Sequence, residues 1–352
     1  MRSRRSFLTQ NAAGPKLGTQ EPSSEENFRR FQRYGVTHIC GWYKIADPAR
    51  LYPTLEELKA VTDLAARHKL TVQMTDTAVG RGAHSALMLG GDGREREIEA
   101  FQETIRACAR AGIPSLKYYL SIFPILRLEK VPGRADTQYW RWNYAVAATP
   151  GGEARMIPGD REELAFIRKN YANFDDDLFW ERVNYVLERI VPVANEYKVR
   201  IAQHPHDPGM PPPGMAGIPT ILGTVDGLKR FVTMHESPYH GLNFCQGTIC
   251  ENLDDPKTQL AEVIRWFGSR RKIFNVHFRN ILGHRDDFVA EIFPDAGDID
   301  MTAAVRAYRE VGYDGMLMPD HVPTLPGGSA HDRDEMFSFG YGYIRALIQA
   351  TA

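Results

Sequence analysis

The sequence predicts an α/β protein with the (β/α)₈ fold, a TIM barrel in which eight parallel strands alternate with helices. Its 352 residues, 43% of them hydrophobic, are enough for one such barrel, which typically takes about 250 residues plus insertions. Eight short apolar runs rich in β-branched or aromatic residues recur along the chain. Helical periodicity follows these runs, a pattern typical of parallel βα units rather than of hairpins.

The predicted strands are short and separated by polar loops and helical stretches. In chain order they are expected at Lys16–Gln20, Val36–Trp42, Leu70–Asp76, Ser115–Leu120, Val199–His204, Gly241–Gln246, Lys272–Arg279 and Tyr313–Asp320. Their number is the most informative feature, because eight strands with intervening helices match the barrel.

Helix-end signals agree with this order. Ser23-Ser24-Glu25-Glu26 and Thr54-Leu55-Glu56-Glu57 fit the capping box, in which a hydroxyl and a carboxylate satisfy free backbone N–H groups at a helix start. Asp255-Pro256 combines an N-cap residue with proline at the first helical position, and Gly112 and Gly312 each follow a predicted helix. Three helices are therefore predicted to begin, and two to end, where the barrel requires it.

Two segments are too long for ordinary connections between a strand and a helix. An insertion at about residues 123–175, after the fourth strand, contains Pro, Gly and many aromatic residues, including Tyr139-Trp140-Arg141-Trp142-Asn143-Tyr144. A second excursion, Leu282–Asp300, follows the seventh strand. We expect both to shape the mouth of one barrel domain spanning residues 15–352, preceded by a tail of residues 1–14.

Composition excludes several kinds of partner. The net charge is −1 and charges of both signs are interleaved, so we expect no nucleic acid and no membrane partner. The four cysteines show no C-x-x-C spacing, which favours a reducing, cytoplasmic setting. Ser3-Arg4-Arg5 resembles a twin-arginine export motif, but the apolar stretch that should follow it is missing.

Four polar residues end the last four predicted strands. They are His204, Cys245, His277 and Asp320. Because the carboxyl ends of barrel strands meet at one mouth, we expect these side chains to converge. Two imidazoles, a thiolate and a carboxylate suit a divalent transition metal, whereas Ca²⁺ and Mg²⁺ prefer oxygen ligands alone. No G-x-S-x-G motif supports a serine nucleophile.

The C-terminal half also resembles a known family, the metal-dependent mannonate dehydratases of the xylose isomerase-like barrels. The matching segments occur in the family's order and with suitable spacing. They are His204-Pro205-His206-Asp207-Pro208, Asn243-Phe244-Cys245-Gln246-Gly247, Val276-His277-Phe278-Arg279-Asn280, Gly297-Asp298-Ile299-Asp300-Met301, Asp320-His321-Val322-Pro323 and the stretch from Phe339 to Leu347.

The resemblance implies a role for particular residues. His204, Cys245, His277 and Asp320 would bind the metal, with Mn²⁺ as the leading expectation and Fe²⁺, Co²⁺ or Zn²⁺ as alternatives. His321 and Tyr341 would transfer protons, and Arg279 would hold the substrate carboxylate. We also place Asn280, His206 and His84 among the substrate-binding residues, although His206 has the alternatives of an extra metal ligand or no role, and His84 that of an ordinary loop residue.

The chemistry implied is removal of a proton α to a carboxylate and loss of the neighbouring hydroxyl, converting D-mannonate to 2-keto-3-deoxy-D-gluconate and water. Tyr341 would need a nearby cation to lower its pKa from an ordinary value of about 10. The segment Ser121–Leu128 departs from the family's motif after the fourth strand, which leaves a different sugar acid open as the substrate.

Two other functions stay open. One is a metal-dependent sugar isomerase or epimerase of the xylose isomerase-like class, although those relatives usually bind the metal with glutamates, and none ends the last four predicted strands. The other is a sugar-acid binding protein without catalysis, for which His321 and Tyr341 would serve no purpose. A small-molecule sugar acid is the expected partner, and association into a homo-oligomer is left open.

Overall fold

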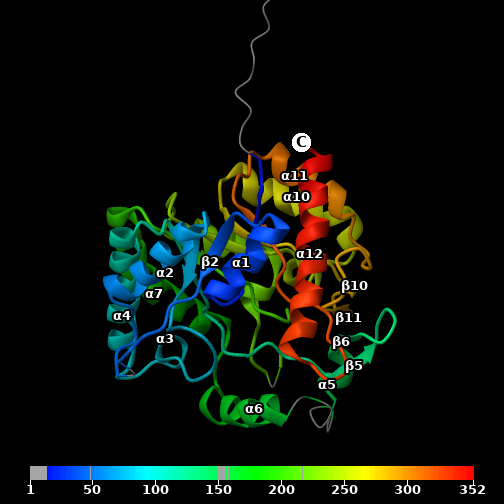
Figure 1. The fold of residues 1–352 in the computed structure, drawn as a ribbon. Coiled ribbons are helices and arrows are strands. Elements are labelled where there is room, and N and C mark those ends of the chain that lie inside the picture. The colour runs from blue at the N-terminus through cyan, green and yellow to red at the C-terminus, as the bar shows by residue number, and fades with distance from the viewer. Residues whose placement is uncertain (1–13, 48, 150–151, 153–155, 157, 216) are drawn as a thin grey trace, which may run out of the picture.

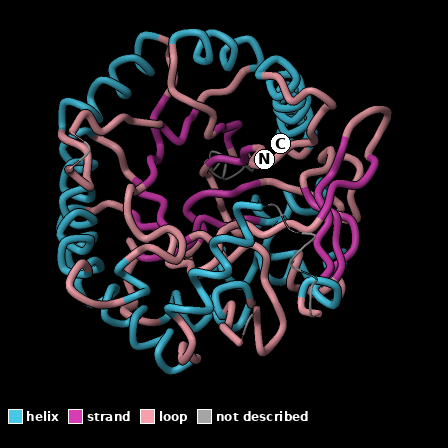
Figure 2. The backbone as a smooth tube through the Cα atoms, turned by 90° about the horizontal axis from the view of Figure 1, so that it is seen from below, coloured by secondary structure: helices cyan, strands magenta, loops and turns pink. Residues whose placement is uncertain are grey.

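Eight parallel strands close into a barrel in the computed structural model, and helices surround the ring (Figures 1 and 2). The structure describes residues 14–47, 49–149, 152, 156, 158–215 and 217–352, and the predicted twin-arginine-like segment lies outside them. The barrel strands are β1 (Lys16–Thr19), β2 (His38–Gly41), β3 (Thr71–Asp76), β4 (Ser115–Tyr118), β7 (Arg200–Gln203), β8 (His240–Cys245), β9 (Ile273–His277) and β12 (Met316–Met318).

All eight predicted strands are confirmed, each shorter than or similar to its prediction. One long helix follows each strand and packs on the outside of the ring. These helices are α1 (Glu25–Tyr34), α2 (Leu55–Arg67), α4 (Arg94–Ala111), α7 (Asp176–Tyr197), α8 (Val225–Thr233), α10 (Pro256–Ser269), α11 (Met301–Glu310) and α12 (Ala330–Ala350). Shorter elements in the loops are α3 (Ala86–Leu89), α9 (Gln246–Cys250) and the 3₁₀ helix η2 (Ile221–Gly223).

Two of the three predicted helix-start motifs are confirmed, and one is wrong. Thr54 and Glu57 form the predicted capping box of α2, and Asp255 caps α10 ahead of its first-turn proline. The capping box predicted at residues 23–26 is wrong, because Ser24 is the N-cap of α1 and accepts from the backbone N–H of Asn27, which leaves an amide side chain at the position a glutamate should occupy.

Two layers of apolar side chains hold the barrel together. The interior is filled by Cys40, Met74, Ala202, Phe274, Met316 and Met318. A much larger cluster, which includes Phe28, Phe101 and Phe267, lies between the strands and the surrounding helices. Side chains on a strand alternate between these two layers, so the parity of a strand residue decides whether it can face the mouth.

The two predicted insertions meet in a second, small sheet. The segment after β4 forms β5 (Glu129–Pro132), β6 (Gln138–Asn143), α5 (Tyr144–Ala147) and α6 (Pro158–Asn170), and the excursion after β9 forms β10 (Leu282–His284) and β11 (Asp287–Ala290). β6 pairs antiparallel with β11, giving the order β10-β11-β6-β5. The sheet stands beside the barrel mouth, and α6 lies below the carboxyl ends of the strands (Figures 1 and 2).

No helix in the described part of the chain has the length and apolar character needed to cross a membrane.

Candidate metal and substrate site

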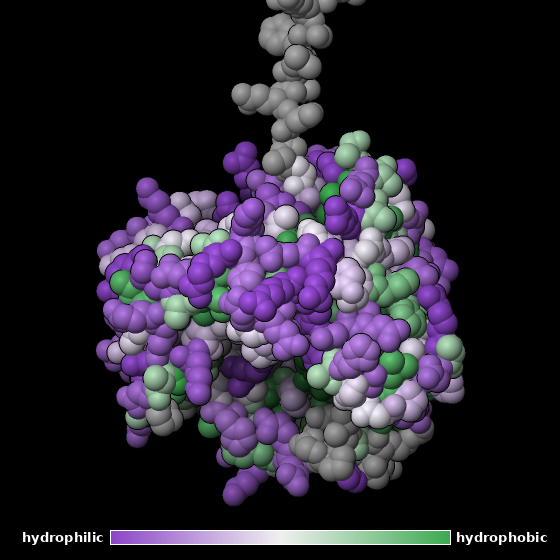
Figure 3. All heavy atoms as spheres, viewed as in Figure 1, coloured by the Kyte–Doolittle hydropathy of each residue, from purple (hydrophilic) through white to green (hydrophobic). Residues whose placement is uncertain are grey.

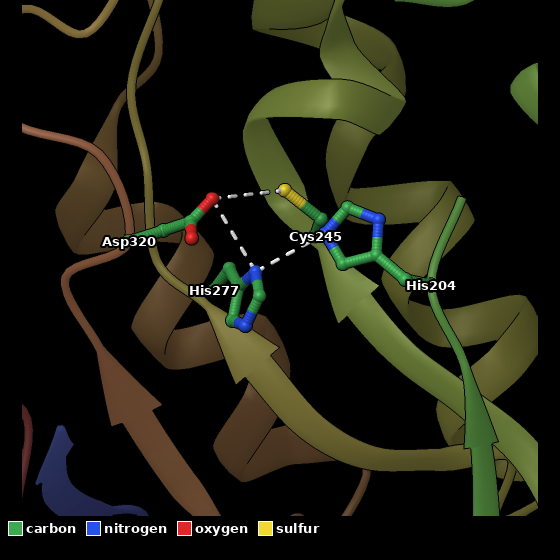
Figure 4. A group of neighbouring side chains, drawn as sticks. All are labelled: His204, Cys245, His277 and Asp320. Carbon is green, nitrogen blue, oxygen red and sulfur yellow. Dashed lines mark hydrogen bonds and ion pairs between the residues drawn. The ribbon is translucent and has the colours of Figure 1, made fainter. Parts of the chain in front are cut away.

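The four residues that end the last four strands converge at the barrel mouth. Cys245 and His277 are the final residues of β8 and β9, whereas His204 follows β7 by one residue and Asp320 follows β12 by two. One potential ligand atom from each lies within 4.8 Å of the others, and all four side chains are buried. Figure 4 shows the side chains pointing toward one common point.

Strand register explains the convergence. β7, β8, β9 and β12 are neighbours in the barrel, and Cys245 lies directly beside His277 in the ladder. The Nδ1–H of His204 donates to the carbonyl of Pro205 at 2.7 Å, which turns Nε2 toward the group. Asp320 is oriented from the neighbouring strand β1, because Gln20, which follows β1, donates to its Oδ1 at 2.6 Å.

The donor set fits a divalent transition metal. Its closest internal contacts are long, with 3.3 Å from His277 Nδ1 to Asp320 Oδ2 and 3.8 Å from Cys245 Sγ to the same oxygen. Burial lowers the pKa of His204 and raises that of Cys245 to about 12. A cation among these buried atoms would compensate their poor mutual contacts and favour the neutral imidazole and thiolate forms that bind metals.

A cavity of about 1,040 Å³ opens in front of this group. It is visible as the hollow low in the centre of Figure 3. We call the part of its lining that comes from β7, β8, β9, β12 and their following loops the C-terminal wall, and the part that comes from β1 to β4 and their following loops the N-terminal wall. The first includes His204, Asp320 and His321, and the second includes Gln20, Asp76, Arg81, Lys117 and Tyr119.

His321 lines the cavity beside Asp320. Its Nδ1 lies 3.3 Å from Glu291 Oε1 and its Nε2 lies 3.6 Å from Asp320 Oδ2. Burial opposes the charged imidazolium, but the carboxylates of Asp320 and Glu291 raise the pKa of His321 above its ordinary value. The ring is therefore flanked by two carboxylates.

Tyr341 does not reach the cavity. Its hydroxyl lies 2.7 Å from Thr19 Oγ1, and its ring packs against Phe31 and Phe337 in the layer between strands and helices. Thr19 has the same parity on β1 as Leu17, which belongs to that outer layer. The Tyr341 hydroxyl is thus directed to Thr19 and away from the cavity, and burial raises its pKa.

Arg279 is also placed away from the cavity lining. One of its Nη atoms lies 3.0 Å from Asp207 Oδ2, 2.9 Å from Glu251 Oε1 and 2.9 Å from Thr248 Oγ1. Its side chain is 1% exposed. The guanidinium predicted to hold the substrate carboxylate contacts two buried protein carboxylates, of which Asp207 lines the cavity.

The other predicted substrate-binding residues have structural contacts outside the cavity lining. Asn280 binds the backbone of Ile281, Pro294 and Ile299, which ties down the excursion after β9. His206 is buried with its Nε2 2.8 Å from the carbonyl oxygen of Leu120. His84 is exposed and lies over Phe166 of α6. These three side chains join loops at the mouth.

The N-terminal wall contains residues that sequence reasoning passed over. Lys117 has the clearest sequence signal, because it is a lysine within a strand. It lies next to Leu116, which belongs to the outer layer, so its side chain points to the inside of the barrel. Arg81 lies in the glycine-rich loop after β3, and Glu291, which belongs to the C-terminal wall, lies in the second excursion. Only the cavity lining identifies the three as neighbours of the site.

Comparisons with known proteins identify the family of the chain. The family model described as D-mannonate dehydratase (UxuA) matches residues 27–351. A mannonate dehydratase from Thermotoga neapolitana is 30% identical over 343 residues, covering 90% of this chain and 91% of that protein.

Solved structures support the fold. A mannonate dehydratase from Streptococcus suis superposes with a TM-score of 0.78 at 22% identity, covering 96% of this chain and 95% of the other. A xylose isomerase domain protein from Planctomyces limnophilus gives a TM-score of 0.59 at 12% identity, covering 96% and 98%. The barrel, the buried His, Cys, His and Asp group and the match over residues 27–351 lead to one conclusion: this chain belongs to the D-mannonate dehydratase family.

Proposed function

We propose that this protein is a metal-dependent hydro-lyase that dehydrates a sugar acid, with D-mannonate as substrate and 2-keto-3-deoxy-D-gluconate and water as products. The observation that carries the proposal is the buried group of His204, Cys245, His277 and Asp320 at the floor of a cavity, with His321 beside it. Membership of the D-mannonate dehydratase family supports the choice of substrate.

The same four residues would hold the metal, for which we propose Mn²⁺, with Fe²⁺, Co²⁺ and Zn²⁺ as alternatives. Mixed nitrogen, sulfur and oxygen donors distinguish this group from the all-oxygen sites of Ca²⁺. When bound, a divalent cation acts as a Lewis acid that stabilises negative charge developing on substrate oxygens.

His321 would provide the proton that the departing hydroxyl needs to leave as water. Dehydration removes the hydrogen on the carbon next to the carboxylate and the hydroxyl on the following carbon, and the resulting enol becomes the keto acid. Glu291 stabilises the protonated ring of His321 from the side away from Asp320. The proposal does not include proton transfer by Tyr341, because the hydroxyl of Tyr341 is hydrogen-bonded to Thr19.

The first experiment is turnover of D-mannonate by metal-stripped protein with and without Mn²⁺, with direct detection of 2-keto-3-deoxy-D-gluconate. Product that appears only with the metal supports the proposal. D-Gluconate and the neutral keto-sugar D-fructose are assayed in parallel. Dehydration of gluconate alone would replace the substrate, and epimerisation of the keto-sugar without dehydration of either acid would replace the reaction class.

A further inference from the structure

Two cations and one carboxylate are grouped on the N-terminal wall. Asp76 ends β3, Arg81 follows in the next loop, and Lys117 comes from β4. Lys117 Nζ lies 3.4 Å from Asp76 Oδ2, and Arg81 Nη2 lies 3.4 Å from the same oxygen. Both separations are longer than a good charged hydrogen bond, and a single carboxylate cannot neutralise two cations.

Lys117 is buried, so its positive charge is poorly compensated by water. Its side chain is 6% exposed, and its other polar contact is a neutral one, the 2.9 Å hydrogen bond to Gln20 Oε1. A buried ammonium group is costly unless it is paired. The guanidinium of Arg81 lies 3.9 Å from the ring centre of Tyr119 and borders the same cavity.

The other charged groups near the cavity do not supply the missing anion. Asp320 is directed to the metal group and to Gln20, and Glu291 faces His321 and Arg127. Asp207 contacts Arg127 and Arg279, and the carboxylate of Asp332 accepts from the backbone N–H of Ser329 in the capping box of α12. Among the described residues, the N-terminal wall therefore presents a net positive charge to the cavity.

This charge lies next to the metal group. Lys117 donates to the side-chain amide of Gln20, and the same amide donates to Asp320, so one amide separates the ammonium from a metal ligand. The ring of Tyr119 stacks on His204 with 5.1 Å between ring centres. A small acid held by its anionic end at Lys117 and Arg81 would have its adjacent carbons near the metal ligands.

We propose that Lys117 and Arg81 form the carboxylate-binding site that selects acids over neutral sugars. The proposal rests on the proposed function for the identity of the acid, and it assigns to the N-terminal wall the role first expected of Arg279. Their two charges would contact the carboxylate oxygens, and Asp76 would hold both side chains in place.

Lys117→Met and Arg81→Met variants test this site. For each, we expect the KM for D-mannonate of the metal-loaded enzyme to rise about 10- to 100-fold, the loss typical of a charged hydrogen bond. Calorimetric binding of D-mannonate to metal-stripped protein should weaken by a similar factor, and binding of neutral D-mannose should not change. Arg81 is 62% exposed on its side chain, so its variant keeps the test valid if Lys117→Met fails to fold.

Lys59→Met is the control, because Lys59 is exposed on α2 and does not belong to the cavity lining. Unchanged KM and binding in both Arg81→Met and Lys117→Met, or an equal loss in Lys59→Met, would overturn the site while leaving the proposed function intact. If D-mannonate is not turned over but gluconate binds in a manner that depends on Arg81 and Lys117, the site stands and the proposed substrate fails.

Discussion

The two walls of the barrel mouth differ in how their polar residues are paired. On the C-terminal wall, His204, Cys245, His277 and Asp320 point at one another, and the arginine behind them is neutralised by buried carboxylates. On the N-terminal wall, Arg81 and Lys117 share one carboxylate. The first wall is organised to hold a cation, and the second has charge left over for an anion. The two walls would therefore have different roles, with the reaction at the C-terminal wall and binding of the substrate's carboxylate at the N-terminal wall.

The largest expected effect comes from the metal group. Cys245→Ala should lose bound metal and at least about 1,000-fold in turnover, because the Lewis-acid contribution is several kcal/mol. Metal content by mass spectrometry and the initial rate measure the effect. Cys250→Ala is the control, since Cys250 is equally buried but lies outside the group. Equal metal content in the two variants would show that Cys245 is not a metal ligand.

His321 tests whether proton transfer belongs to the same wall. His321→Gln should lower kcat by about 100- to 10,000-fold, the range for general acid catalysis, while metal content stays unchanged. His84→Gln changes an exposed histidine outside the cavity lining and should leave kcat unaltered. A kcat within a few-fold of the wild type in His321→Gln would remove this residue from the reaction.

The Arg279→Met variant distinguishes a structural role of Arg279 from direct contact with the substrate. Arg279→Met leaves Asp207 and Glu251 without their shared partner, and we expect a loss of about 3–5 kcal/mol in the free energy of unfolding. Denaturant titration measures it, with Arg265→Met, which breaks an exposed pair with Glu310, expected to cost less than about 1 kcal/mol. Unchanged stability with a raised KM would instead make Arg279 a substrate-binding residue.

Tyr341→Phe has the smallest expected effect. It removes the hydroxyl bonded to Thr19, and we expect a loss of about 1 kcal/mol in the free energy of unfolding. The kcat should stay within about two-fold of the wild type, because a residue that does not touch substrate contributes no transition-state binding. A large fall in kcat at unchanged stability would show that α12 moves Tyr341 into the mouth during turnover.

The sequence by itself determined the barrel and the metal group. Strand positions follow from local apolar runs, and parallel strands bring their carboxyl ends to one mouth, so residues such as Cys245 and His277 could be paired without knowing any contact. Helix signals such as Thr54 and Glu57 are equally local.

Only the tertiary structure decided what the remaining polar residues do. Whether Tyr341 faces the cavity or Thr19 depends on how α12 docks on β1, and the partners of Arg279 come from the segments after β7 and β8. Lys117 and Arg81 become a pair because β3, the loop that follows it and β4 meet around Asp76. Charge pairing of this kind depends on distances between segments that are remote in the chain, and local periodicity does not encode those distances.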